Sequence, residues 1–396
     1  MAIQKTDEGA ARAQDDSRGD LKLQTHAPSP APHHSKDDRM TKSSWISRLL
    51  RKPEFASVAG AIFVFAVFGV FAHDSGMFAA DGIVNWSQVS AYLGILAVGA
   101  CLLMIAGEFD LSLGSMIGFA GMLMAIPAVY YGVPLWASIL LAFAGSMALG
   151  ALNGWIVVRT KLPSFIVTLA FLFILRGLTL MLSVGIANRT VVSGVGDLVE
   201  KDWLAQTLFA GTTFKWLMSF LSSVHIVGIL PNGTPMVTGI PKVIIWWIVL
   251  AVAGAWVLVK THFGNWIFSV GGDANAARNM GVPVKFVKIS LFVLTSFCGC
   301  LFAVLQVCDI GSASADRGLQ KEFEAIIAAV IGGCLLTGGY GSVIGACFGA
   351  LIFGVVQMGI TYTGAPPEMF RVFLGAMLLM AVLFNNFIRS KVAQSK

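Results

Sequence analysis

Apolar and polar segments alternate along the chain from residue 55 to residue 388, and ten apolar runs can be distinguished. An α-helix needs roughly 20 residues to cross the hydrocarbon core of a bilayer. The predicted spans are residues 55–73, 88–106, 111–131, 135–158, 163–184, 242–260, 286–306, 324–338, 342–362 and 368–388. The pattern therefore predicts an all-α protein, a polytopic transmembrane helical bundle of about ten spans. The expected range is eight to ten, because the eighth run is short and the third could enter and leave one face as a broken helix.

The composition supports a membrane protein. The 396 residues are 56% hydrophobic and only 12% charged, which is too apolar for a single water-soluble core. The net charge of +6 does not indicate nucleic-acid binding, because the basic residues lie in the N-terminal tail and beside apolar runs. The six cysteines lie mostly in or beside apolar runs without CxxC spacing, which favours packing over a disulfide or metal role.

Charge predicts which side of the membrane each segment faces. Residues 1–52 are polar and carry both signs of charge, so we expect a disordered tail, and Lys and Arg residues directly before the first run place it in the cytoplasm. Residues 53–390 then form the transmembrane domain, and residues 391–396 form a C-terminal tail that is also cytoplasmic. The long outer segment 185–241 contains an apolar patch at 209–227, for which a helix at the membrane surface is favoured slightly over a loop.

The polar segment 262–288 differs from the other polar segments because positive charge stands at both of its margins. It carries Arg278, Lys285 and Lys288, with Lys260 shortly before it, and the single acid Asp273. A Gly271-Gly272 start, a core from Ala274 to Met280 and a stop at Gly281 predict a short helix on the cytoplasmic face. A short helix held between two spans has a shape suited to receiving force from a soluble partner.

Two carboxylates, Glu108 and Asp110, stand between the second and third predicted spans. Acids at the membrane edge are candidates for a functional role, here in gating or coupling. The alternative is that Asp110 or Ser112 caps the third span by accepting its free backbone N–H groups. Gly114 and Gly118 form a GxxxG pattern, which predicts close helix packing.

Several polar residues inside or near the spans could line a path for a polyhydroxyl solute, or could form hydrogen bonds between helices. Arg176 is the best single candidate for a pore-facing or paired residue, since it is an uncompensated cation in an apolar run. The other candidates are Asn153, Ser164, Thr168, Asn188, Gln306, Glu324 and Gln357.

No catalytic or nucleotide-binding motif is present, so the sequence does not indicate an enzyme. It contains no HExxH and no GxSxG, and its histidines are dispersed. The glycine-rich segment 332–342 resembles a phosphate loop but lacks the lysine, and it predicts a tight turn instead. If ATP drives transport, another polypeptide must bind it.

Four stretches together resemble the permease subunit of ribose-type monosaccharide ABC importers, over roughly residues 55–390. They are residues 108–115, 271–282, 324–333 and 337–342. The resemblance implies a bacterial inner-membrane protein that works as a homodimer or a pair of like permeases, with a periplasmic sugar-binding protein. It also implies cytoplasmic ATPase subunits that hold ATP and Mg, while this chain binds no cofactor.

The resemblance further identifies residues 271–282 as the coupling helix that docks on the ATPase. Ala276 and Ala277 are small enough to enter a cleft, and Arg278 can pair with an acid of the partner. Asn275 stands where many such permeases have Glu, which argues against a fixed ion pair at that position. The matching residues are Gly271, Gly272, Asp273, Ala276, Ala277, Arg278 and Gly281.

Three other functions stay open at this point. Related permeases for nucleosides or branched-chain amino acids share the coupling loop and the glycine turns. A secondary transporter driven by protons or sodium would use acids within broken helices, and Glu108, Asp110 and Glu324 are the candidates. A structural membrane scaffold would not need the glycine-bounded basic loop.

Overall fold

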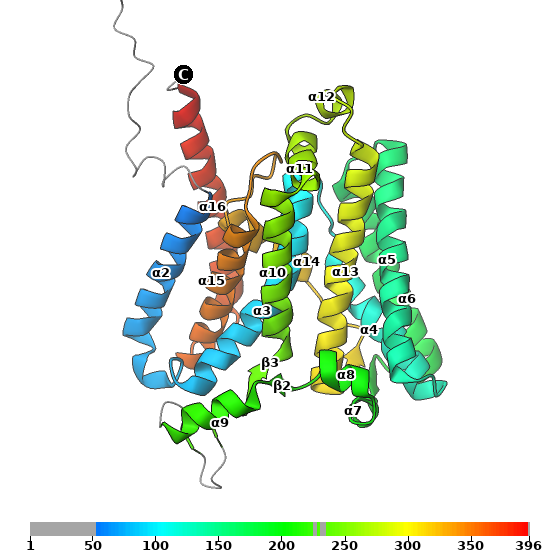
Figure 1. The fold of residues 1–396 in the computed structure, drawn as a ribbon, viewed down its shortest axis with the longest axis vertical. Helices are drawn as coiled ribbons and strands as arrows, with labels where there is room; N and C mark the ends of the chain where they lie inside the picture. The colour runs from blue at the N-terminus through cyan, green and yellow to red at the C-terminus, as the bar shows by residue number, and fades with distance from the viewer. Residues whose placement is uncertain (1–52, 225–227, 230–234, 395–396) are drawn as a thin grey trace, which may run out of the picture. The chain divides into compact units, whose positions relative to one another are not determined.

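In the computed structural model, residues 53–224, 228–229 and 235–394 are described, all within the unit Trp45–Lys396. The predicted tail, residues 1–52, lies outside the described residues. Ten helices follow the ten predicted apolar runs (Figure 1). They are α2 (Pro53–Phe71), α3 (Ala80–Ile105), α4 (Leu113–Tyr130), α5 (Leu135–Thr160), α6 (Ser164–Ala187), α10 (Lys242–Lys260), α13 (Val284–Ile310), α14 (Lys321–Ile331), α15 (Val343–Tyr362) and α16 (Met369–Gln394).

These helices confirm the all-α, polytopic class. Seven of them are long and apolar enough to cross a membrane, judged by length and composition: α3, α4, α5, α6, α10, α13 and α15. Two further apolar helical segments are shorter, Ser57–Phe71 in α2 and Met369–Met380 in α16. The number of crossings stays a prediction.

The eighth predicted span, residues 324–338, is wrong in its extent. The structure has only the 11-residue helix α14 there, which at 1.5 Å per residue covers about half of the ~30 Å hydrocarbon core. Gly332 follows the last residue of the helix. A Cβ added to it would clash with the backbone nitrogen of Ala346 in α15, which would lie only 2.4 Å away. The chain then turns through Gly333, whose φ is 92°, and continues to α15.

The helices form an inner and an outer group. Most of α3, α4 and α13 is buried inside the bundle, whereas only 28% of the apolar window of α6 and 22% of that of α10 is buried. The exposed side chains of the outer helices are apolar, among them Phe173, Trp256 and Val259. In a membrane protein such faces suit contact with lipid, so the inner helices form the core around which the site is built.

The two ends of the bundle carry different elements (Figure 1). One end carries α11 (His262–Gly272) and α12 (Ala274–Asn279). The beginning of α2 and the end of α16 lie toward it. The opposite end carries helices and strands that are all short. They are η2 (His73–Ser75), β1 (Val191–Ser193), α7 (Val195–Val199), α8 (Trp203–Leu208), β2 (Thr212–Thr213), α9 (Lys215–Ser223), β3 (Ile240–Pro241) and β4 (Ser312–Ser314).

The short strands of this end pair into two antiparallel ribbons. β1 pairs with β4, with Val192 opposite Ala313, and β2 pairs with β3, with Thr212 opposite Pro241. The first ribbon connects the segment after α6 with the segment before α14. Helix α9 forms within the apolar patch predicted at 209–227, of which residues 225–227 lie outside the described part. Its place at a membrane surface stays a prediction.

Candidate coupling element and the helix breaks beneath it

The predicted short helix in the basic segment exists, as α12. The carboxylate of Asp273 caps it by accepting hydrogen bonds from the backbone N–H groups of Asn275 (2.8 Å) and Ala276 (3.1 Å). Gly281 ends it with a φ of 86°, a backbone conformation that favours glycine. The helix ends at Asn279, one residue before the predicted Met280.

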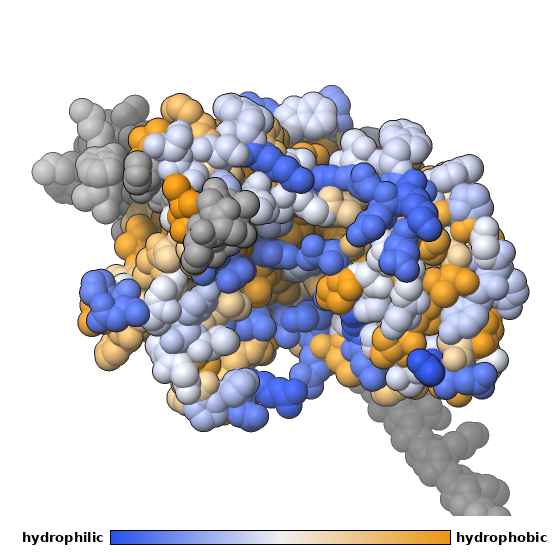
Figure 2. Space-filling view, turned by 90° about the horizontal axis from the view of Figure 1, so that it is seen from below, coloured by the Kyte–Doolittle hydropathy of each residue, from blue (hydrophilic) through white to orange (hydrophobic). Residues whose placement is uncertain are grey.

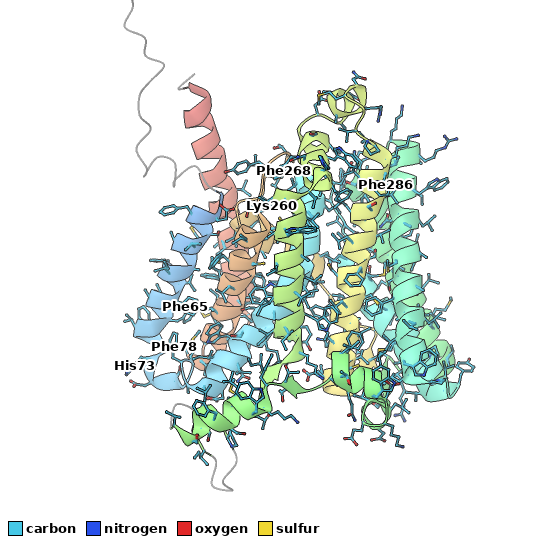
Figure 3. All side chains as sticks on the ribbon, viewed as in Figure 1. Phe65, His73, Phe78, Lys260, Phe268 and Phe286 are labelled. Carbon is cyan, nitrogen blue, oxygen red and sulfur yellow. The ribbon has the colours of Figure 1, made fainter. Side chains whose placement is uncertain are left out.

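The predicted glycine start of this helix is wrong. Gly271 and Gly272 are the last residues of α11, a helix in a stretch that we predicted as loop. The hydroxyl of Thr261 accepts from the N–H of Gly264 (3.2 Å) at the start of α11. The helix buries Ile267 and Val270, which lie three residues apart on the face toward the bundle. Lys260, Phe268 and Phe286 mark this end of the molecule in Figure 3.

Ala277 is not available for docking, which corrects the expectation for the alanine pair. Its side chain is 0% exposed within the chain itself, whereas Ala276 and Arg278 are exposed. Met280, which the sequence analysis did not single out, is 72% exposed. A large apolar side chain next to a free guanidinium on a protruding helix is typical of a docking surface. Ala276 and Arg278 in α12 and Met280 directly after it are thus exposed, whereas Ala277 is not.

Three chain segments meet without side chains beneath α12, at a contact that we name the glycine junction: Gly107, Gly271, Gly338 and Gly339. A Cβ on Gly271 would overlap the carbonyl oxygen of Ile105 and lie 2.6 Å from the nitrogen of Gly339. A Cβ on Gly338, whose φ is 78°, would lie 2.7 Å from Cα of Gly107. The N–H of Gly339 donates to the carbonyl of Ile105 (2.8 Å). The end of α11 thus touches both the end of α3 and the segment that leads into α15.

The backbone of Gly272 borders this contact, 3.2 Å from the position of a Cβ on Gly339, but Gly272 itself has space for a side chain. An added Cβ would meet nothing within 4 Å there, and the residue is exposed. Of the two adjacent glycines that the sequence singled out, only Gly271 is required by packing.

Residues 106–112 form a non-helical break between α3 and α4, and side chains of α6 hold it. The N–H of Phe109 donates to the hydroxyl of Ser164 (3.0 Å), and the N–H of Leu111 donates to that of Thr168 (3.0 Å). Irregular backbone at membrane depth persists only where protein groups satisfy its polar atoms. Ser164 and Thr168, both candidates for a solute path, therefore serve as partners of the break.

Asp110 is buried at the centre of a hydrogen-bond network. Its Oδ1 accepts from the N–H (2.9 Å) and the hydroxyl (2.5 Å) of Ser112, and its Oδ2 accepts from the hydroxyl of Thr295 (2.7 Å) on α13. Asn153 of α5 donates to the Ser112 hydroxyl (3.1 Å). The network joins the start of α4 to α5 and α13.

The network shows that capping alone does not describe Asp110 and Ser112. Ser112 stands at the N-cap of α4, but its hydroxyl accepts no bond from the first turn. Asp110 does satisfy one N–H at this helix start, that of Ser112, as the capping interpretation predicted. Its second oxygen binds Thr295, a residue that the sequence analysis did not identify. No local signal could identify Thr295, since it lies 185 positions along the chain.

Glu108 forms an ion pair with Lys288 in the first turns of α13, and both side chains are largely buried. The sequence analysis identified both residues but did not pair them. The pair fixes the beginning of the break to the helix that directly follows α12. Glu108, Asp110, Ser112 and Asn153, which were separate candidates in the sequence, thus lie in one connected cluster with Thr295 and Lys288.

The other candidate path residues lie outside this cluster. Arg176 donates to the carbonyl of Ala315 (3.3 Å), and Glu324 pairs with Lys321 within α14. The Oε1 atom of Gln306 is buried, with no hydrogen-bond partner in the described part of the chain. Gln357 accepts from the Thr361 hydroxyl through its main-chain carbonyl (3.1 Å). None of these contacts gathers the four residues into a common site.

The Gly114 and Gly118 pattern packs against the loop before α14 and the first turn of α14. A Cβ on Gly118 would lie 3.0 Å from the carbonyl oxygen of Ala315, and one on Gly114 would overlap the carboxylate of Glu322. The segment before α14 therefore presses on the first turns of α4. Glu322 is buried in the first turn of α14.

Seven membrane-length helices and a protruding, capped helix define the class of protein, a multi-pass membrane protein with an element suited to a soluble partner. A family model described as the branched-chain amino acid transport system / permease component matches residues 82–382. The chain belongs to this family of permeases. This membership and the relatives below confirm the predicted type, a multi-pass inner-membrane permease of sugar ABC importers.

Individual relatives are sugar permeases. The chain is 32% identical to the xylose transport system permease protein XylH of Escherichia coli (strain K12), over 82% of this chain and 90% of that protein. It is 30% identical to XylH of Haemophilus influenzae, over 84% and 96%. It is 29% identical to the ribose import permease protein RbsC of Escherichia coli (strain K12), over 78% and 87%. No solved structure matches the chain.

Proposed function

We propose that this chain is the membrane-spanning subunit of an ATP-driven importer of a monosaccharide or cyclic polyol. The names of the relatives, xylose and ribose permeases, support the sugar. The description of the family model names branched-chain amino acids, so these, together with nucleosides, are the second candidate substrates. Few charged side chains lie within the spans, which argues against a charged solute.

The partners follow from the two ends of the bundle. A cytoplasmic ATPase docks on α12 and holds ATP and Mg, while this chain binds no cofactor of its own. A periplasmic sugar-binding protein delivers the solute to the end that carries α7, α8 and α9. A second, like permease completes the path, within the lipid bilayer and without nucleic acid.

The glycine junction transmits the movement of the ATPase. Closure of the two ATPase subunits displaces α12 and α11, and Gly271 then presses on backbone atoms of Ile105 and Gly339. Because no side chain lies between these backbones, none can rotate to absorb the displacement. The ends of α3 and α15 therefore move with α11, as packed elements do in hinge and shear transitions.

The Asp110 network gives the break a defined position while this happens. Hydrogen bonds join residues 108–112 to α5, α6 and α13, so the segment moves together with these helices. The hydrogen bonds of this network favour one arrangement over many, although the buried Oδ1 atom of Asn153 has no partner among the described residues.

The observation that carries this proposal is the exposed, capped α12 seated on the glycine junction. Its test is Arg278→Glu in the intact importer, with Arg159→Glu as control, an exposed basic residue at the last turn of α5. We expect Arg278→Glu to lower both co-purification of the ATPase subunit and solute uptake about tenfold or more, as loss of an interface charge does. The control should change neither. Intact association and uptake in Arg278→Glu would contradict the coupling assignment.

An ion-driven transporter is the alternative from another class, and Asp110 beside a helix break is the observation that favours it. Both of its oxygens are, however, already engaged by hydrogen bonds from Ser112 and Thr295. Uptake into proteoliposomes that contain ATP, measured with a protonophore and a sodium ionophore present, separates the two. Uptake that stops under these conditions would support the ion-driven alternative.

A further inference from the structure

A polar hollow lies at the end of the bundle opposite α12, where α3, α10 and α13 meet. It has room for about one water-sized group, a cavity volume of about 10 Å³, and side chains of all three helices line it together with Phe209 and Gly211, just after α8. Figure 2 shows this face of the molecule, on which hydrophilic residues surround a recessed area with hydrophobic residues in it. The described coupling element and the Asp110 network make no use of this hollow.

A carboxylate with an unused oxygen stands in the hollow. The Oδ2 atom of Asp309 accepts from the amide of Gln88 (2.9 Å), and the hydroxyl of Tyr92 lies 3.5 Å away. Among the described residues, none donates a hydrogen bond to its Oδ1, and the side chain is exposed. Lys242, also in the lining, donates to the carbonyl of Gln206. Gln88 thus orients Asp309 while leaving one oxygen open to the hollow.

The rest of the lining is apolar and partly aromatic. The ring of Tyr92 packs on Phe302 with centroids 5.0 Å apart, and Phe209 stacks on Trp246 at 6.1 Å. These contacts fix the rings that face the hollow. A rigid lining with a few oriented polar groups is the common design of small-molecule sites.

This combination of groups fits a polyhydroxylated ring. A sugar hydroxyl can donate to the free carboxylate oxygen and accept from an amide or an ammonium group. The hollow is far smaller than the roughly 300 Å³ at which ligand pockets usually begin, so it takes a single hydroxyl group, and the rest of the monosaccharide stays outside it. Partial contact suits a transport site, which must also release its ligand.

We propose that this hollow is the entry site of the permease, at which Asp309 and Gln88 bind a hydroxyl of the incoming sugar. The inference rests on the proposed function and names a contact of the same solute. Asp309 supplies the open acceptor, and Gln88 supplies the amide that holds it in place.

The experiment compares transport of a sugar with transport of an analogue that lacks one hydroxyl. The complete importer is reconstituted in proteoliposomes with one binding protein throughout. The probes are D-xylose and D-ribose, and whichever the wild type transports is paired with its monodeoxy analogues. The variants are Asp309→Asn and Gln88→Leu. The control is Asp316→Asn, an exposed acid shortly after α13 that does not line the hollow.

Asp309→Asn should lower the transport rate of the sugar about tenfold, the usual size of a lost hydrogen bond to a charged group. It should also reduce the preference for the sugar over one deoxy analogue, because that analogue has no bond to lose. Gln88→Leu should act in the same direction by less, and Asp316→Asn should match the wild type.

Unchanged rates, or equal losses for the sugar and every analogue, would overturn the entry site, since damage to the fold or to docking of the binding protein affects all of them alike. A wild type that moves neither of these sugars nor any other monosaccharide or cyclic polyol would overturn the proposed function, and with it this site.

Discussion

Two helix breaks, residues 106–112 and residues 332–342, have related sequences but are held in different ways. The first break follows a Cys-Leu-Leu triplet at 101–103, and the second contains one at 334–336. The sulfur atoms of Cys101 and Cys334 lie 3.1 Å apart, so the two triplets are in contact. The two breaks also meet at the glycine junction.

The first break is held by polar side chains. The N–H groups of Phe109 and Leu111 donate to the hydroxyls of Ser164 and Thr168. Glu108 pairs with Lys288, and Asp110 accepts from the hydroxyls of Ser112 and Thr295. The second break is held by close backbone contacts at glycines, where no side chain keeps the segments apart. Gly333, Gly338 and Gly339 have positive φ angles, and Gly332 and Gly345 pack backbone against backbone. The first should therefore be sensitive to loss of polar atoms, and the second to any added carbon.

The largest effect on stability is expected at Gly345, where an added Cβ would overlap the carbonyl oxygen of Gly332. Gly345→Val should lower the free energy of unfolding by about 3 kcal/mol. The atoms of Gly332 that the new side chain would meet belong to the backbone and cannot rotate away. Thermal denaturation of the purified protein in detergent measures it. The control is Gly177→Val, where a Cβ would meet nothing within 4 Å. Equal losses in the two variants would remove the steric explanation.

A smaller loss is expected when the first break loses its central acid. Asp110→Ala leaves the N–H and the hydroxyl of Ser112 without their acceptor, while the Thr295 hydroxyl can still donate to the carbonyl of Phe292 (2.9 Å), and it should cost about 2 kcal/mol. Asp110→Asn should cost less, since an amide oxygen can still accept from one of them. Thermal stability and uptake are measured together. Normal uptake with lower stability in Asp110→Asn would assign Asp110 a structural role only.

The smallest effect is expected from the hydroxyls of α6. Ser164→Ala and Thr168→Val each remove one acceptor from the break and should cost about 1 kcal/mol. Thr179→Val is the matched control, because the Thr179 hydroxyl bonds only to Leu175 of its own helix (2.6 Å). A thermal shift of Thr179→Val as large as that of Thr168→Val would show that the bonds to the break contribute nothing specific.

The sequence predicted where helices occur better than it predicted how long they are. The ten apolar runs all contain helices, because hydrophobicity along the chain depends on burial in lipid or in the bundle. The eighth run was predicted too long because residues 332–336 are small or apolar, so the run continues where the helix stops. What ends α14 is close contact with α15, which is a tertiary effect.

The candidate site could be predicted only where its signals are local. The Asp273 cap and Gly281 stand directly at the ends of α12, and both are visible in the sequence. The pairing of Glu108 with Lys288 joins positions 180 residues apart. The burial of Ala277 depends on which side of a six-residue helix faces the bundle, and six residues are too few to show a periodic pattern.

Coupling through the glycine junction is tested most directly by Gly338→Ala in the complete importer, with sugar transported and ATP hydrolysed measured in the same proteoliposomes. The added methyl group would press on Gly107, 2.7 Å away, without touching α12. Gly364→Ala is the control, since its φ of 70° carries a similar backbone cost where a Cβ meets nothing within 4 Å. We predict that Gly338→Ala still binds its ATPase and hydrolyses ATP but transports several-fold less sugar per ATP, whereas Gly364→Ala keeps the wild-type ratio. A wild-type ratio in Gly338→Ala would contradict the account.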